Sequence, residues 1–199
     1  MTTANDTRRI LIGVSGGIAA YKACDVVSAL RKEGRRVSVI MTHNATRIVT
    51  PLTLETLSHE RVVTDLFTDA EQHLPDHIDM KHAAAVLAIV PATANLLAKA
   101  AAGIADDALS TTLITVTCPI LFCPAMNTAM WNHPTVARNI QTLQAFGHQF
   151  LMPVAGELAC GDVGDGKLAP VEEILAAIRR LADGQLAQSV RKSVKGKPS

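Results

Sequence analysis

The sequence is poor in aromatic residues, which make up only 3% of its 199 residues. It contains no apolar run of the roughly 18 residues that a membrane-spanning helix needs, so we expect no membrane association. A formal net charge of only +1 argues against a general nucleic-acid or polyanion binder. Apolar residues nevertheless reach 48%, which predicts one packed domain with a mostly aliphatic core.

The cysteines lack any spacing typical of a metal centre or a redox pair. They lie at Cys24, Cys118, Cys123 and Cys160. The N-terminus, MTTANDTRR, is polar and leads directly into an apolar segment, so we expect no secretory signal. Together these features predict a cytoplasmic protein whose thiols are reduced.

Two patterns that would indicate a ligand site are incomplete. His73 and His77 have the spacing of two zinc ligands on one helix face, but Pro75 between them argues against a continuous helix. We therefore predict no metal. The segment Gly161–Lys167, GDVGDGK, fits the start of a P-loop, but Leu168 stands where Ser or Thr would bind magnesium, and no strand is expected before it. We predict no nucleoside triphosphate site there.

Short apolar segments alternate with helical ones along most of the chain. Strands are expected at Arg9–Val14, Val37–Met41, Ala85–Val90, Ile120–Cys123 and His148–Met152. Helices are expected at 18–32, 94–102, 106–114, 134–146 and 171–182. Continuous apolar strands are typical of a parallel sheet covered on both faces, and their alternation with helices implies right-handed crossovers. We predict a doubly wound α/β domain with three layers, of the flavodoxin-like or Rossmann-like kind.

Three segments stand outside this alternation. Residues 42–59 are polar, and Pro51 suits the first position of a helix. The segment Val154–Ala169 carries four glycines and little apolar pattern, which predicts a mobile loop. From Asp183 onward the chain is basic without a core pattern. We therefore assign residues 1–182 to the domain and 183–199 to a tail or linker.

The first expected strand runs into the loop VSGGIAAYK, which opens a helix. In doubly wound folds, ligands bind at the carboxyl ends of the strands. Gly16 and Gly17 let the backbone approach a phosphate, and a helix N-terminus supplies N–H groups with a positive dipole. We interpret Ser15–Gly17 as a phosphate site; the alternative is a tight turn between strand and helix.

The same loop is not a dinucleotide fingerprint, because G-x-G-x-x-G is absent. Thr42 follows the second expected strand, in place of the Asp or Glu that would bind an adenosine ribose. A hydroxyl suits a phosphate oxygen better. The loop therefore indicates a mononucleotide, with FMN as the leading candidate.

A polar side chain among apolar ones follows the Ile120–Cys123 strand. The segment Pro124–Trp131 reads PAMNTAMW and lies at the same end of the sheet as the first loop. Asn127 can donate and accept hydrogen bonds, which suits a ligand carboxylate or amide, and Met126 and Met130 would form an apolar wall. An equally good interpretation makes Asn127 the cap of the following helix, with the methionines in the core.

PAMNTAMW matches in full the PxMNxxMW motif of the homo-oligomeric flavin-containing cysteine decarboxylases, and the chain resembles that family. The likeness extends to the first loop, to His77 in HIDM, to PATANLLAKAAAGIADDALSTTL at 91–113 and to Cys160 in ACGDVG. It covers about residues 9–180 in the same order. The loop ACGDVGDGKLA is most similar to the bacterial branch that acts on phosphopantothenoylcysteine in coenzyme A biosynthesis, which has an active-site cysteine there.

The resemblance implies roles for individual side chains. FMN would be held by Ser15, Gly16, Gly17, Ile18, Thr42, Ala92, Thr93, Ala94 and Asn95. His77 would be an active-site histidine, and Cys160 would donate a proton. Asn127 would bind the substrate carboxylate beside Met126 and Met130.

The implied reaction converts phosphopantothenoylcysteine to phosphopantetheine. A carboxylate next to an amide nitrogen has no good electron sink, so flavin first oxidises the carbon that bears the thiol. CO₂ then leaves, and reduced flavin returns the hydride to the enethiol. This sequence is redox-neutral and needs no nicotinamide. Cys160 suits the proton donor because a glycine-rich loop can close over a substrate.

The resemblance also bears on partners and on rival functions. It implies a homotrimer or a dodecamer of trimers with sites where protomers meet, and a downstream ligase domain fused in many bacterial members. A peptidyl-cysteine decarboxylase shares the Asn motif, whereas a flavin prenyltransferase of the same fold would lack PxMNxxMW and the cysteine loop. A flavodoxin-like electron carrier or a non-catalytic FMN-binding regulatory subunit would not need His77, Asn127 and Cys160 together.

Overall fold

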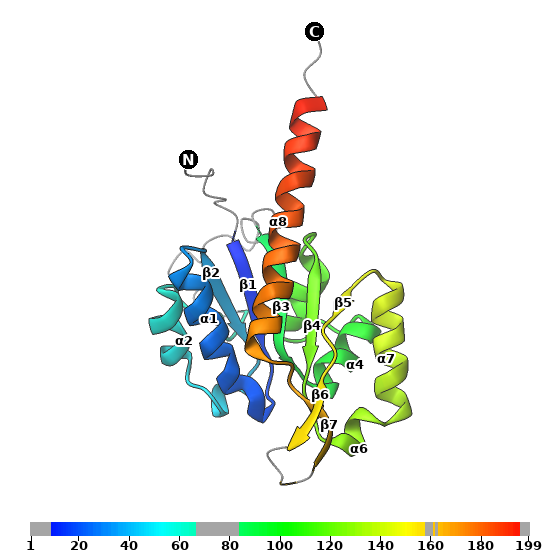
Figure 1. Cartoon of the computed structure of the whole chain (residues 1–199). Coiled ribbons are helices and arrows are strands. Elements are labelled where there is room, and N and C mark those ends of the chain that lie inside the picture. Colours follow the sequence, from blue (N-terminus) through cyan, green and yellow to red (C-terminus); the bar gives the residue numbers. More distant parts are fainter. Residues whose placement is uncertain (1–8, 67–83, 158–160, 162, 196–199) are drawn as a thin grey trace.

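A five-stranded parallel sheet forms the centre of the protein in this computed structural model (Figure 1). The structure describes residues 9–66, 84–157, 161 and 163–195, with side chains described as far as Gly184. The strand order is β2–β1–β3–β4–β5, and every neighbouring pair is parallel. The bounds are Arg9–Val14 for β1, Val37–Met41 for β2, Ala84–Ala92 for β3, Ile120–Pro124 for β4 and Gln149–Phe150 for β5.

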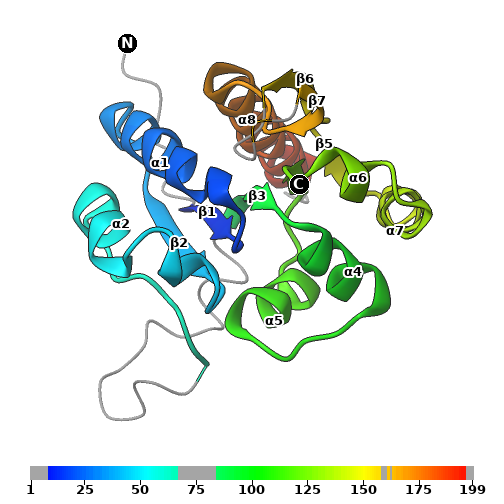
Figure 2. The same ribbon diagram turned by 90° about the horizontal axis from the view of Figure 1, so that it is seen from below.

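Helices cover both faces of this sheet, as Figure 2 shows from below. One face packs against α1 (Lys22–Lys32) and α8 (Val171–Lys195), and the other against α4 (Ala94–Ala102), α5 (Ala108–Thr115) and α7 (Pro134–Ala145). Successive side chains of a strand point to opposite faces, so Ile10 and Ile12 enter the first core and Leu11 enters the second. The shorter elements are η1 (Ile18–Tyr21), η2 (Ala45–Arg47), α2 (Pro51–Ser58) and α6 (Thr128–Trp131). The predicted three-layer, doubly wound fold is confirmed.

The strand order creates a switch point between β1 and β3. From β1 the chain moves outward to β2 and then returns to pair β3 with the other edge of β1. In this topology ligands bind in the crevice outside the carboxyl ends of the two strands. Ser15 follows β1 and Thr93 follows β3, so the two residues lie at this crevice.

Local sequence signals account for most element boundaries. α4 has the bounds expected for it, and Thr93 caps it by accepting a hydrogen bond from the Leu96 N–H. Pro51 occupies the first turn of α2, as predicted. The expected helix at 18–32 is divided into a 3₁₀ turn, η1, and the α-helix α1. Such 3₁₀ turns are frequent at the N-termini of α-helices.

The mobile loop predicted for Val154–Ala169 is wrong where the structure describes this segment, because most of that part is a hairpin. β6 (Val154–Glu157) and β7 (Val163–Lys167) pair as an antiparallel hairpin, with Gly156 opposite Gly164. Its ladder consists of backbone hydrogen bonds, which require no apolar side chains, so a glycine-rich and largely exposed hairpin leaves no hydrophobic pattern.

Helix α8 continues to Lys195, well past the expected end at residue 182, and projects from the body of the molecule in Figure 1. Its first half packs Ile174, Leu175 and Ile178 into the core. A role of residues 183–199 as tail or linker stays a prediction. Among the described residues, no helix combines the length and apolarity that a membrane span requires.

Candidate cofactor and substrate site

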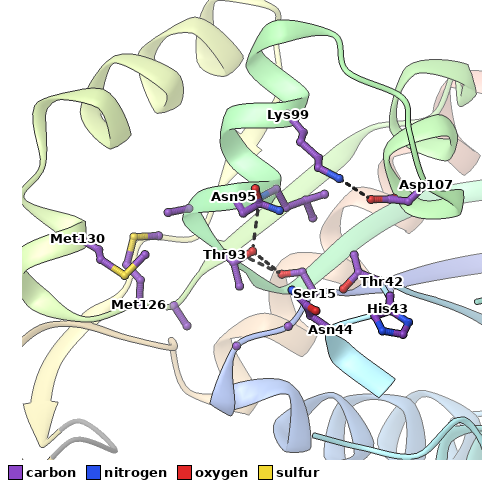
Figure 3. Close-up of a pocket in the computed structure, with 15 residues that line it drawn as sticks. Ser15, Thr42, His43, Asn44, Thr93, Asn95, Lys99, Asp107, Met126 and Met130 are labelled. Atoms are coloured by element: carbon purple, nitrogen blue, oxygen red, sulfur yellow. Dashed lines mark hydrogen bonds and ion pairs between the residues drawn. The ribbon is translucent and has the colours of Figure 1, made fainter. Parts of the chain in front are cut away.

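A cavity of about 490 Å³, here called the strand-end cavity, lies at the carboxyl ends of β1 and β3. In Figure 3, Ser15, Thr42 and Asn44 lie on one side of it, with Met126 and Met130 across from them. The predicted site residues that line it are Ser15, Gly16, Gly17, Thr42, Thr93, Ala94, Asn95, Met126 and Met130. The fold therefore brings three separate sequence motifs together at the switch point.

The Ser15 side chain joins the ends of β1 and β3. It is only 1% exposed, and its Oγ donates to the Pro91 carbonyl oxygen at 2.7 Å. The same Oγ accepts from the Thr93 N–H at 3.0 Å and lies 3.1 Å from Thr93 Oγ1. These hydrogen bonds fix the Ser15 side chain and hold the loop in place. We therefore expect the glycines after Ser15, and not its hydroxyl, to approach a phosphate.

Gly16 contacts the turn that follows β2. A Cβ at Gly16 would collide with the Cβ and the carbonyl carbon of Asn44. In that turn Thr42 donates its N–H to the Val14 carbonyl at 3.0 Å, and Thr42 Oγ1 accepts from the Ala45 N–H at 3.3 Å. Glycine is required here because the two segments meet through their backbones, which leaves Thr42 and Asn44 beside the loop at the cavity wall.

The segment after β3 supplies the opposite wall. Thr93 and Asn95, at the start of α4, line the strand-end cavity. The Ala92 side chain is fully buried in the core and Ala92 is not among the residues that line the two cavities, so its cofactor role stays a prediction. The Ala92 carbonyl instead accepts from the Ala125 N–H at 3.2 Å, which aligns the ends of β3 and β4.

Lys99 and Asp107 also line the strand-end cavity, although no motif indicated them. Lys99 Nζ lies 2.6 Å from Asp106 Oδ1 and 2.9 Å from Asp107 Oδ2, the second pair being drawn in Figure 3. The hydrogen bonds that Lys99 donates to both carboxylates raise its pKa. Asp107 also forms a capping box with Ser110. An Asp three residues before a Ser, ahead of an apolar segment, was the signal available in the sequence.

Asn127 caps the short helix α6. Its Oδ1 accepts from the Ala129 N–H at 2.7 Å, so the capping interpretation is correct. Capping does not conflict with ligand binding, because the cap uses the amide oxygen whereas a carboxylate requires the amide N–H donors. The predicted substrate role of Asn127 stays a prediction.

The β6–β7 hairpin is attached to the Asn127 segment by hydrogen bonds. The Met126 N–H donates to the Gly166 carbonyl at 3.0 Å, and Thr128 Oγ1 donates to the Asp165 carbonyl at 2.8 Å. A Cβ at Gly164 would meet the Thr128 side chain, so glycine permits this contact. Cys160 belongs to the sequence between the two strands of the hairpin.

A second, larger cavity of about 1180 Å³, here called the hairpin groove, adjoins the first. One wall comes from η1 and α1, where Ile18 lies, and the other from the hairpin and the start of α8. The two cavities share Gly17, Ala125 and Met126, and Asn127 lines the groove. Asn127 therefore lies in the larger cavity, next to Met126, which lines both.

The described cysteines are poor candidates for chemistry. Burial raises the pKa of Cys118 to about 11 and that of Cys123 to about 12. Burial, together with the negative charge of Asp25, also raises the pKa of Cys24. Since the thiolate is the reactive form, these thiols are unreactive near neutral pH and cannot replace Cys160 in its predicted role.

Two of the three predicted catalytic residues, His77 and Cys160, lie outside the described residues, and so does His73. Their roles stay predictions. Within residues 9–66, 84–157, 161 and 163–195, no cluster of three or more His, Cys, Asp or Glu side chains could hold a metal ion.

A doubly wound sheet with a glycine loop at its switch point and a second cavity beside it defines the class as an α/β protein with the kind of site that holds a nucleotide-type cofactor. Residues 1–183 match the Flavoprotein family, and the chain belongs to that family.

Two curated relatives have the same name and are longer than this chain. The coenzyme A biosynthesis bifunctional protein CoaBC of Bacillus subtilis is 44% identical over 192 residues, which cover 96% of this chain and 46% of the relative. The protein of the same name from Mycobacterium tuberculosis is 47% identical over 176 residues, covering 88% of this chain and 42% of the relative. The chain thus spans less than half the length of these relatives.

Two solved structures share the fold of this chain, and the match covers nearly the whole length of each solved structure. A mutant of PPC decarboxylase complexed with pantothenoylaminoethenethiol is 30% identical, with a TM-score of 0.77 and coverage of 87% of this chain and 97% of that one. The FMN-dependent cysteine decarboxylase SpaF is 34% identical, with a TM-score of 0.75 and coverage of 90% and 99%.

Proposed function

We propose that this chain binds FMN and decarboxylates phosphopantothenoylcysteine to phosphopantetheine, a step of coenzyme A biosynthesis. One observation carries the proposal: Met126 lines both the strand-end cavity and the hairpin groove, and its neighbour Asn127 lines the groove, so a substrate in the groove would meet the Asn127 amide beside the cofactor cavity. The names of the relatives support it, since they are proteins of coenzyme A biosynthesis and a decarboxylase bound to a pantothenoyl compound.

The strand-end cavity has the donors that the phosphate of FMN requires. Gly16 and Gly17 expose backbone, Thr42 and Asn44 add a hydroxyl and an amide, and the buried Ser15 hydroxyl holds the loop in place. The cavity volume of about 490 Å³ lies within the range of cofactor sites. When bound, flavin supplies reversible hydride transfer at the carbon that carries the substrate thiol.

The residues around the junction would then orient the substrate. We assign the Asn127 N–H donors to the cysteinyl carboxylate, which places the bond to be broken against the apolar wall of Met126 and Met130. An apolar wall favours loss of CO₂ because it offers the carboxylate little solvation. Cys160 would donate the final proton, and His77 would orient the substrate thiolate or assist proton transfer.

The hairpin groove also distinguishes the proposal from an electron carrier. A flavodoxin-like carrier or a regulatory subunit needs a cofactor site but has no use for a groove of about 1180 Å³ beside it. A peptidyl-cysteine decarboxylase would use such a groove, and SpaF is a cysteine decarboxylase with 34% identity. The higher identity to the two CoaBC proteins, 44% and 47%, favours the phosphopantothenoyl substrate.

A competition experiment tests this assignment. The FMN-loaded protein is mixed with equal amounts of phosphopantothenoylcysteine and of a peptide that ends in cysteine, and both products are followed by mass spectrometry. We expect the first substrate to lose CO₂ and the peptide to remain intact. Preferential decarboxylation of the peptide would overturn the substrate, and no reaction with either compound would overturn the enzyme class.

We further propose that the protein works as a homotrimer or as a dodecamer of trimers. Several side chains beside the two cavities are well exposed, among them Ile18 at 61%, Tyr21 at 54% and Met130 at 47%. Apolar groups of this kind gain stability when another protomer covers them. Light scattering should give the mass of three or twelve chains, and a fully active monomer would contradict the assembly.

A further inference from the structure

Lys167, the last residue of β7, has a fixed backbone and a side chain that lies across the hairpin. Its neighbour Gly166 accepts a hydrogen bond from Met126 at 3.0 Å, which anchors this end of the strand beside the Asn127 segment. A Cβ built on Gly156 would lie 3.0 Å from Lys167 Cδ and 3.4 Å from Lys167 Nζ. The stem of Lys167 therefore crosses β6 at the place where Gly156 has no side chain, and Lys167, which is exposed, is among the residues that line the hairpin groove.

The other charged side chains in the groove differ from Lys167 in their partners. Lys22 Nζ lies 3.6 Å from Asp25 Oδ2 and 5.1 Å from the centre of the Tyr21 ring. Glu157 and Glu172 also line the groove, yet no carboxylate in the described part of the chain lies within ion-pair distance of Lys167. Lys167 is thus an exposed cation at the groove that has no counter-ion among the residues the structure describes.

We propose that Lys167 binds the phosphate of the extended substrate, an inference that rests on the proposed function. The substrate carries two anionic groups, a carboxylate at the reacting end and a phosphate monoester at the other. Asn127 is assigned to the carboxylate. An ammonium suits a phosphate as a point charge, and the strength of such a charge-assisted bond makes Lys167 a determinant of substrate choice.

The neighbouring wall fits the part of the substrate between these two ends. Residues 168–171, which follow Lys167, read LAPV and line the same groove. They offer an apolar surface to the branched aliphatic portion of a pantothenoyl arm. Lys167 therefore recognises the phosphate while its sequence neighbours contact the uncharged arm.

The test compares two substrates that differ only in the phosphate, phosphopantothenoylcysteine and pantothenoylcysteine. In K167Q, kcat/KM for the phosphorylated substrate should fall by about 10- to 100-fold, mainly through KM, as expected for loss of a bond to a charged group. For the unphosphorylated substrate the change should stay below about threefold. K167R should restore most of the preference, because it keeps the charge.

K22Q is the matched control, since Lys22 lines the same groove but is paired with Asp25. It should leave the ratio of the two substrates unchanged. If K167Q raised KM equally for both substrates, Lys167 would act on the carboxylate that they share, and the proposal would be overturned. It would also be overturned if K22Q, and not K167Q, lost the preference for the phosphorylated substrate. Failure of the wild-type protein to decarboxylate either substrate would refute the proposed function itself, which is a distinct result.

Discussion

Gly166 and Met126 contact each other directly through their main chains. The Met126 N–H donates to the Gly166 carbonyl at 3.0 Å, and a Cβ on Gly166 would overlap the Met126 carbonyl oxygen. Gly166 also has a φ of +120°, a conformation that side chains disfavour. The β6–β7 hairpin is therefore attached to the segment that carries Asn127, and the two form one unit at the junction of the cavities.

Replacement of Gly166 by alanine should separate cofactor binding from turnover. The added methyl group displaces the hairpin from Met126, while the loop at Ser15 is untouched. We expect FMN to bind with nearly normal affinity and kcat to fall by about 100-fold, the effect of small misplacements in an active site. Gly34→Ala is the control, because Gly34 has a φ of +78° but nothing within 4 Å of the added atom. Equal activity of G166A and the wild type would contradict this role of the contact.

Two replacements of Asn127 should distinguish capping from substrate binding. Aspartate caps helices as well as asparagine does, so Asn127→Asp keeps the bond to the Ala129 N–H but places a negative charge against the substrate carboxylate. We expect an unchanged melting temperature and a loss of decarboxylation of at least about 100-fold, equal to about 2.7 kcal/mol. Asn127→Ala should lose both the helix cap, which lowers the melting temperature, and the decarboxylation activity. If the aspartate variant stayed active, Asn127 would be only a cap.

Loss of the Ser15 hydroxyl should destabilise the fold as well as the site. Ser15→Ala leaves the buried Thr93 N–H and Pro91 carbonyl without this partner, which costs about 1–3 kcal/mol in the free energy of unfolding. Urea denaturation measures this, and FMN affinity should fall as the loop loosens. Thr56→Ala, which removes an exposed hydroxyl bonded to the Leu52 carbonyl at 2.8 Å, should cost much less. Similar losses for the two variants would argue against the joining role of Ser15.

At the opposite end of the sheet, Glu60 links the starts of β1 and β2. It lies 3.6 Å from Arg9 Nη2, accepts from Arg36 Nε at 2.7 Å and also accepts from Ser38 Oγ. Burial alone would raise the pKa of Glu60, but these hydrogen bonds and the two positive charges outweigh it and lower the pKa below its ordinary value of 4.5. The carboxylate therefore stabilises the fold above that pH, and its contribution disappears as the pH falls through the lowered pKa.

Glu60→Gln should weaken both stability and its acid dependence. At about pH 7 the free energy of unfolding should fall by about 1–3 kcal/mol, the value of hydrogen bonds to a charged group. Between about pH 5 and pH 3 the variant should lose less stability than the wild type, since it has one fewer group to protonate. Urea melts over this range measure the effect, with the exposed Glu173→Gln as control. Parallel pH curves for wild type and E60Q would contradict the assignment.

Much of the fold was predictable because buried parallel strands leave a strong apolar signal. Residues of β1, β2 and β4 are buried throughout, and each strand stood out in the sequence. The hairpin of β6 and β7 did not, because Gly156, Gly164 and Gly166 make close contacts with neighbouring segments and have no side chains that would add to an apolar pattern. A cluster of glycines indicates flexibility or close approach equally well, and only tertiary contacts decide between them.

The candidate site was predictable where a sequence motif indicates both the chemistry of a residue and its position at the end of a strand. The loop at Ser15–Gly17 and the Asn127 motif lie at the ends of β1 and β4, where the topology brings them together. Lys167 was missed because nothing in the sequence distinguishes this exposed lysine at the groove from any other surface charge. The cofactor role of Ala92 stays a prediction, and only its backbone could serve it, since Ala92 ends β3 with its side chain in the core.

The most direct test of the whole account is a product balance on the FMN-loaded protein. Phosphopantothenoylcysteine labelled in its cysteinyl carboxyl group is supplied without nicotinamide or oxygen, and labelled CO₂ and phosphopantetheine are measured together. The account predicts equal amounts of both over many turnovers, with the flavin oxidised at the end. Release of CO₂ that stops after one equivalent per flavin, or no release from flavin-loaded protein, would contradict a redox-neutral decarboxylase.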